Sequence, residues 1–189
     1  MWWRKQRTAV RAVTRLGIVL AASGLLAGCF QPLYGRSPTV GGDSVRDKLA
    51  EVQIGQIPTR QGTPQARLAV GMHNALQFDL TGGGGAASAP THRLDLTVSA
   101  TGLTVIVDAS SGRPTAQIAG VLVTYQLVEI ATGKVVLQDT TSANVDYDAP
   151  GPEQRFAVQR AQRDAEDRAV QAAAESIRNR LASYFVAGT

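Results

Sequence analysis

The stretch Gln117-Ile-Ala-Gly-Val-Leu-Val-Thr-Tyr-Gln-Leu-Val-Glu-Ile130 decides the fold. From Val121 to Leu127 every second residue is apolar, and the residues between them include Thr124 and Gln126. Successive side chains of a strand point to opposite faces, so this alternation is typical of a sheet with one buried and one solvated face. The stretch therefore predicts a β-strand with one face in water.

Strand patterns flank this stretch on both sides. Residues 94–99 alternate in the same way, and Gly102 predicts a bulge or bend before a further run at residues 103–107. After the central stretch, Ala131-Thr-Gly-Lys134 predicts a hairpin turn into a strand over residues 135–147. We expect three strands in succession.

Two helices are predicted outside these strands. Thr63 and Pro64 suit an N-cap and a first helical position, and the helix runs to about Leu80. Residues 156–185 form a longer helix without internal glycine or proline. Helical spacing predicts the buried side of each helix. In the first helix that side is Leu68, Met72, Ala75, Leu76 and Leu80; in the second it is Val158, Ala161, Ala165, Ala169, Ala172 or Ala173, Ile177, Leu181 and Tyr184.

Upstream of the first helix, residues 49–57 predict a short strand that ends at Pro58, and residues 43–47 predict a turn or loop. The order of elements is strand, helix, three strands, helix. We therefore expect an α+β fold, with a four-stranded, mostly antiparallel sheet and both helices packed on one face. Residues 49–189 are expected to form a single domain.

The N-terminus is typical of a bacterial lipoprotein. Five basic residues and no acid precede an apolar run over residues 16–26, which is too short to span a bilayer. Leu26-Ala-Gly-Cys29 closes that run, and Cys29 is the only cysteine of the chain. We expect residues 1–28 to be a cleaved signal peptide and Cys29 to carry the lipid. Residues 29–48 are expected to be an extended leader, and Phe30 after the cysteine favours sorting to the outer membrane.

Removal of the signal peptide changes the charge balance. The chain has 19 basic and 15 acidic residues, and the signal peptide contains five of the basic ones. The mature chain keeps 14 against 15, a formal net charge of −1. The basic character of the full sequence is thus no argument for nucleic-acid binding. With its sole thiol taken by lipid, the domain has no disulfide and depends on its core for stability.

No catalytic, metal or cofactor site is predicted. His73 and His92 have no cysteine or suitably spaced acid near them in the sequence, whereas a zinc site needs three or four ligands. The glycine-rich residues 82–90 lack the lysine and hydroxyl ending of a phosphate-binding loop and predict a connector. Carboxylates of the last helix lie among arginines, which favours exposed ion pairs over acid–base chemistry: Asp164, Glu166, Asp167 and Glu175.

Particular residues resemble the lipopolysaccharide-assembly lipoprotein family LptE, especially its alphaproteobacterial branch. Cys29-Phe-Gln-Pro-Leu-Tyr-Gly35 is similar to the Cys-Gly-Phe-x-Pro-Leu-Tyr-Gly stretch of that branch, with one glycine missing here. Weaker matches are residues 163–169 continuing through 177–185, and the turn at Thr132-Gly-Lys134 followed by Asp146-Tyr147. The resemblance covers essentially the whole mature chain, and the leader is its most specific part.

The resemblance implies a protein that is not an enzyme. Such a protein is anchored in the outer membrane, facing the periplasm or the barrel lumen, and binds, plugs and helps to assemble the barrel LptD of the lipopolysaccharide translocon. It also implies lipopolysaccharide as a possible ligand, although no local motif maps such a site here. On charge alone, Arg93, Arg113 and Lys134 are candidates for contact with lipid A phosphates, and ordinary solvated charges remain the alternative.

Two other classes of protein remain open. Another small lipoprotein facing the periplasm, such as a pilotin of a secretin or an accessory subunit of a lipid transporter, would share the lipidation motif. It would not share the Pro32-Leu-Tyr-Gly35 leader or the order of elements. A lipid-modifying hydrolase is disfavoured because no nucleophile motif is present.

Overall fold

A computed structural model describes residues 44–85, 87–107, 109, 112, 114–149 and 154–187. The predicted signal peptide, Cys29 and Arg113 lie outside the described residues. Within them the chain forms α2 (Val45–Ala50), β1 (Val52–Ile54), α3 (Pro64–Thr81), β2 (His92–Val107), β3 (Pro114–Glu129), β4 (Val135–Asp148) and α4 (Arg155–Ala187). None of these helices combines the length and the apolar character needed to cross a membrane.

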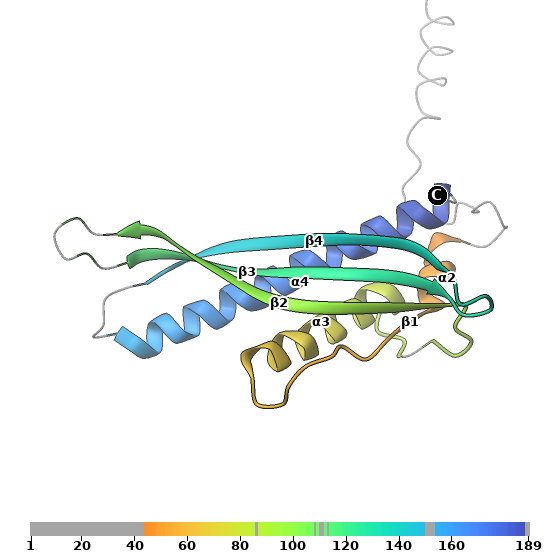
Figure 1. Cartoon of the computed structure of the whole chain (residues 1–189), viewed down its shortest axis with the longest axis horizontal. Helices are drawn as coiled ribbons and strands as arrows, with labels where there is room; N and C mark the ends of the chain where they lie inside the picture. Colours follow the sequence, from red (N-terminus) through yellow and green to blue (C-terminus); the bar gives the residue numbers. More distant parts are fainter. Residues whose placement is uncertain are drawn as a thin grey trace, which may run out of the picture. The chain divides into compact units, whose positions relative to one another are not determined.

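The four strands form one sheet in the order β1-β2-β3-β4 (Figure 1). β2, β3 and β4 pair antiparallel, and the short β1 pairs parallel with the start of β2. The alternation in the central stretch is confirmed, because Val121, Val123 and Leu127 are fully buried while Thr124 is exposed. The predicted α+β class with a mostly antiparallel sheet is confirmed.

The helices cover one face of the sheet. α4 packs against β3 and β4, α3 packs against β2 and β1, and the two helices pack against each other. The apolar sides predicted for α3 and α4 are buried, with Ala75, Val158, Ala161 and Tyr184 only partly so. The open choice in α4 is settled: Ala173 is fully buried and Ala172 is exposed. Helix α4 also buries Val170 and Ala174, which the predicted apolar side of this helix did not include.

Two local predictions are wrong. Residues 43–47 are not simply a turn, because helix α2 begins at Val45. The Ser44 side chain accepts from the Asp47 N–H, and the Asp47 carboxylate accepts from the Ser44 N–H, which is a capping box that starts a helix. Leu49, predicted as the start of a strand, is a buried residue of this helix.

The second error concerns Gly102, which forms no bulge and does not interrupt β2. Its backbone pairs in register with Ala119, and β2 continues as one strand to Val107. The irregularities in pairing come later, between Thr104 and Val107. A glycine in a strand weakens it but still pairs through its backbone.

The contact between α4 and the sheet gives a stability prediction. We expect Ala169→Leu to lower the free energy of unfolding by about 1–3 kcal/mol, because Ala169 is fully buried and extra atoms overpack the core. Ala172→Leu, on an exposed side of the same helix, is the matched control and should change stability little. Denaturant unfolding of both variants measures the difference, and equal stabilities would contradict the burial of this helix face.

Candidate functional site

The face of the sheet away from the helices is built mainly of hydroxyl, amide and carboxylate side chains. The register places every second residue of β2, β3 and β4 on this side. We name it the polar sheet face. Its described members include Arg93, Asp95, Thr97, Ser99, Thr101, Ile118, Gly120, Leu122, Thr124, Gln126, Val128, Gln138, Thr140, Ser142, Asn144 and Asp146, most of them exposed.

Rows of paired residues cross the polar sheet face from strand to strand. Thr97, Thr124 and Thr140 form one such row. The Thr97 hydroxyl lies 3.5 Å from the carbonyl oxygen of Thr124, and the hydroxyls of Thr124 and Thr140 lie 3.3 Å apart. These are long contacts, so the hydroxyls keep donors and acceptors for an external partner.

A glycine allows two side chains to close over the polar sheet face. Gly120 pairs with Thr101 on one side and Asn144 on the other. A Cβ at this position would collide with the Asn144 amide oxygen and lie 2.5 Å from the Thr101 hydroxyl. The face is therefore shaped by the absence of a side chain at Gly120.

Arg93 and Asp95 form an ion pair at the start of β2. The Arg93 guanidinium donates to the Asp95 carboxylate at 2.9 to 3.1 Å. These hydrogen bonds and the carboxylate charge raise the pKa of Arg93 above its ordinary value. A phosphate that binds Arg93 must therefore compete with a carboxylate that is already in contact.

Of the three basic residues predicted to contact lipid phosphates, Arg93 and Lys134 lie in the described part of the chain and Arg113 lies outside it. Arg93 is the second residue of β2, and Lys134 is the last residue before β4, so both lie at one end of the sheet. Phosphate contact remains a prediction for all three residues.

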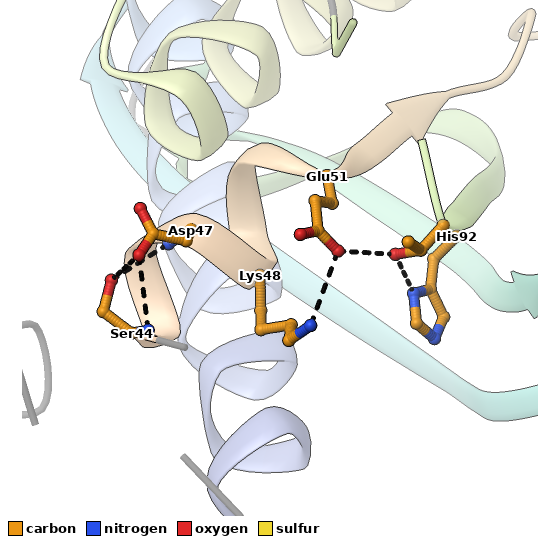
Figure 2. A network of polar contacts seen from close by, with 6 residues as sticks. Ser44, Asp47, Lys48, Glu51 and His92 are labelled. Atoms are coloured by element: carbon orange, nitrogen blue, oxygen red, sulfur yellow. Dashed lines mark hydrogen bonds and ion pairs between the residues drawn. The ribbon is translucent and has the colours of Figure 1, made fainter. Parts of the chain in front are cut away.

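The end with Arg93 and Lys134 also contains a polar network that joins α2 to β2 (Figure 2). Thr91 donates its hydroxyl hydrogen to Glu51 at 3.0 Å, and its oxygen lies 2.9 Å from Nδ1 of His92. Lys48 lies 3.7 Å from the same Glu51 carboxylate. Earlier in α2, the hydrogen bonds of Ser44 lower the pKa of Asp47. The network fastens the start of the domain to the sheet.

His92 makes stability at this end depend on pH. Partial burial lowers the pKa of His92 below its ordinary value of 6.5. The ring of Phe185 contributes to this burial, with the two ring centroids 5.3 Å apart. The charges of Glu129 and Glu51 oppose the shift, and the charge of Lys48 adds to it. The unfolded chain thus binds the proton more readily than the folded chain. We expect the free energy of unfolding to fall as the pH drops through 6.5 toward the lower folded pKa.

Unfolding in denaturant at about pH 7.5 and about pH 5.5 measures this loss, and His92→Gln should reduce it. An equal pH dependence in wild type and His92→Gln would contradict the assignment.

The helices are joined by charges that sequence reasoning only partly predicted. Arg67 of α3 pairs with Glu166 and, at 2.5 Å, with Asp167 of α4. The Glu166 carboxylate also accepts from Gln162 at 2.8 Å, and the residue is only 8% exposed. The expectation of solvated ion pairs is confirmed for Asp164 and Glu175, but it is wrong for Glu166 because α3 covers it.

The described residues include no group of three or more His, Cys, Asp or Glu side chains that could hold a metal ion. A groove of about 980 Å³ lies between α3 and α4 and is lined by Phe78, Asn74 and mixed charges. This groove lies on the helix side, away from the polar sheet face. The polar sheet face is the candidate for a binding surface.

Comparison with known proteins gave one family match. The sequence model of the family LptE, described as lipopolysaccharide-assembly, matches residues 49–181. No curated protein sequence matches the chain. Among solved structures, a candidate lipoprotein from Caulobacter crescentus CB15 is similar, with a TM-score of 0.58 and 21% identity; the match covers 76% of this chain and 96% of that one. Rare lipoprotein B from Shewanella oneidensis has a TM-score of 0.49 and 16% identity, and the match covers 70% of this chain and 93% of that one.

Proposed function

The chain belongs to the LptE family of lipopolysaccharide-assembly proteins, and from this premise we propose that it is an outer-membrane lipoprotein that binds, plugs and helps to assemble the LptD barrel. It acts by binding rather than by catalysis. Lipopolysaccharide then passes to the cell surface through the barrel that this protein completes.

The polar sheet face is the observation that supports this role. The interior of an outer-membrane barrel is polar, so a plug must present hydrogen-bonding groups there rather than an apolar patch. Across β2, β3 and β4 the polar sheet face presents mainly threonine, serine, asparagine, glutamine and aspartate. Its described apolar residues on β3 are the exposed Leu122 and the less exposed Ile118 and Val128. It is therefore the surface that we place against the wall of the barrel.

The anchor of this protein is the lipid expected on Cys29. One acyl chain binds a membrane only marginally at about 0.8 kcal/mol per buried CH₂, whereas lipoprotein processing supplies more than one chain. The domain is thereby kept at the inner leaflet of the outer membrane. Arg93, Arg113 and Lys134 remain predicted contacts for lipid phosphates.

Affinity purification from detergent-solubilised outer membranes tests the function. The proposal expects an LptD-type barrel to co-purify with the full lipidated chain. Recovery of a secretin or of an inner-membrane lipid transporter in place of the barrel would reject it in favour of a pilotin or an accessory subunit.

A further inference from the structure

One end of the domain contains the residues at which the chain enters it. We name it the entry end: α2, Thr91–His92, the turn Ile130–Lys134 with Val135, and the last turn of α4. The Ile130 N–H donates to the Thr91 carbonyl at 3.0 Å, and the Thr91 N–H donates to the Glu51 carbonyl at 3.1 Å. Ring contact between His92 and Phe185 adds the end of α4. Figure 1 shows α2, the turn between β3 and β4, and the end of α4 at the same end of the sheet.

The entry end exposes apolar side chains that the fold does not use. Ile130 is 45% exposed, Val135 is 50% exposed and Val186 is 44% exposed. These are three of the seven exposed large apolar residues in the described part of the chain. Two of them, Ile130 and Val135, lie on either side of the turn that contains Lys134.

Several charged groups at the entry end have partners within the domain, whereas Lys134 is exposed at the turn. Each carboxylate is engaged within the domain: Asp47 by Ser44, Glu51 by Thr91 and Lys48, and Glu129 by the Thr132 hydroxyl at 2.5 Å. Among described residues, no carboxylate forms an ion pair with exposed Lys134 at the turn. A turn with two exposed aliphatic residues and a lysine between them suits a surface of apolar chains beneath phosphate groups.

The length of the tether favours contact at this end. Residues 30–43, fourteen in all, connect the predicted lipid site at Cys29 to Ser44. Fourteen residues reach about 50 Å at most when fully extended. The 33 residues of α4 extend about 50 Å away from the entry end. The tether therefore keeps the entry end close to the membrane more often than the far end of α4.

We propose that the entry end docks on the phospholipid headgroups of the leaflet that holds the anchor. Ile130 and Val135 enter the boundary between headgroups and acyl chains, and the Lys134 ammonium lies among the phosphates. This inference rests on the lipid anchoring of the proposed function. It assigns Lys134 to phospholipid rather than to lipopolysaccharide phosphates.

The test uses the full lipidated chain reconstituted into vesicles of phosphatidylethanolamine and phosphatidylglycerol, without any barrel. Because lipid occupies Cys29, an introduced cysteine is the only free thiol. Val135→Cys carries an environment-sensitive fluorophore, and Val70→Cys, 62% exposed on α3, is the matched control. Nitroxide quenchers attached to the lipids report which label lies at the membrane.

We expect quenching at position 135 and not at position 70. In the labelled chain, Lys134→Ala should lower the ratio of docked to undocked protein about fivefold, since a basic side chain near an anionic surface contributes about 1 kcal/mol. Equal quenching at both positions, or quenching at 135 only when lipopolysaccharide is added, would overturn the proposal. Since no barrel is present, these outcomes leave the proposed binding of LptD to be judged separately.

Discussion

Replacing Thr124 and Ser142 together by arginine is expected to abolish capture of the LptD barrel. Both residues are exposed near the middle of the polar sheet face, on neighbouring strands. Enclosure against the barrel wall would remove two guanidinium groups from water without partners, at a cost of several kcal/mol for each ion. Affinity purification should show at least about a hundredfold weaker binding.

The control for this variant adds the same charge on the helix side. Asn74→Arg and Gln171→Arg alter exposed residues along the groove between α3 and α4. We expect this pair to keep barrel binding, because mixed charges already line the groove. Unchanged folding of both double variants, measured by thermal unfolding, makes the comparison valid. If the helix-side pair loses the barrel and the sheet pair keeps it, the surface has been assigned to the wrong side.

Cys29→Ala is expected to eliminate the anchor completely. Cys29 is the only thiol of the chain, so no second residue can accept the lipid. The variant should accumulate as an unprocessed precursor or appear in soluble fractions. Ser23→Ala, within the apolar run of the signal peptide, keeps the acceptor and is the control. Cell fractionation with mass spectrometry of the N-terminus measures both, and a mature Cys29→Ala protein in the outer membrane would contradict lipidation at this sulfur.

The elements that could be predicted from the sequence are those with a clear period. In β3, alternation along one strand separated buried Val121 and Val123 from exposed Thr124, and this same separation defines the polar sheet face. The long helix followed from helical spacing with Ile177 and Leu181 on its buried side. The spacing of apolar residues alone identifies which side of a helix or strand is buried, because burial of the apolar side drives the packing.

Features that depend on contacts distant in sequence could not be predicted. Glu166 is buried because Arg67, 99 residues earlier, reaches it from α3. The parallel pairing of β1 with β2 joins Val52 to His92, 40 residues later, and no local pattern indicates it. By contrast, the start of α2 had a local pattern that was missed, namely Ser44 with Asp47 three residues later.

The candidate site was only partly accessible from the sequence. Arg93 and Lys134 were selected for their charge and their places at strand ends, and the structure brings these two to one end of the sheet. The ion pair of Arg93 with Asp95, two residues away on the same face, follows from strand geometry and could have been predicted. The exposed Ile130 and Val135 at that end could not be selected from the sequence, because only the fold brings them beside the point where the chain enters the domain.

Site-specific photo-crosslinking in cells tests most directly whether the polar sheet face meets the barrel. A photoreactive phenylalanine analogue replaces Leu122, 40% exposed on the polar sheet face, or Phe78, 66% exposed on α3. We expect irradiation to join the protein to LptD from position 122 and not from position 78. Adducts with LptD from position 78 alone, or adducts from position 122 with a secretin in place of LptD, would contradict the account.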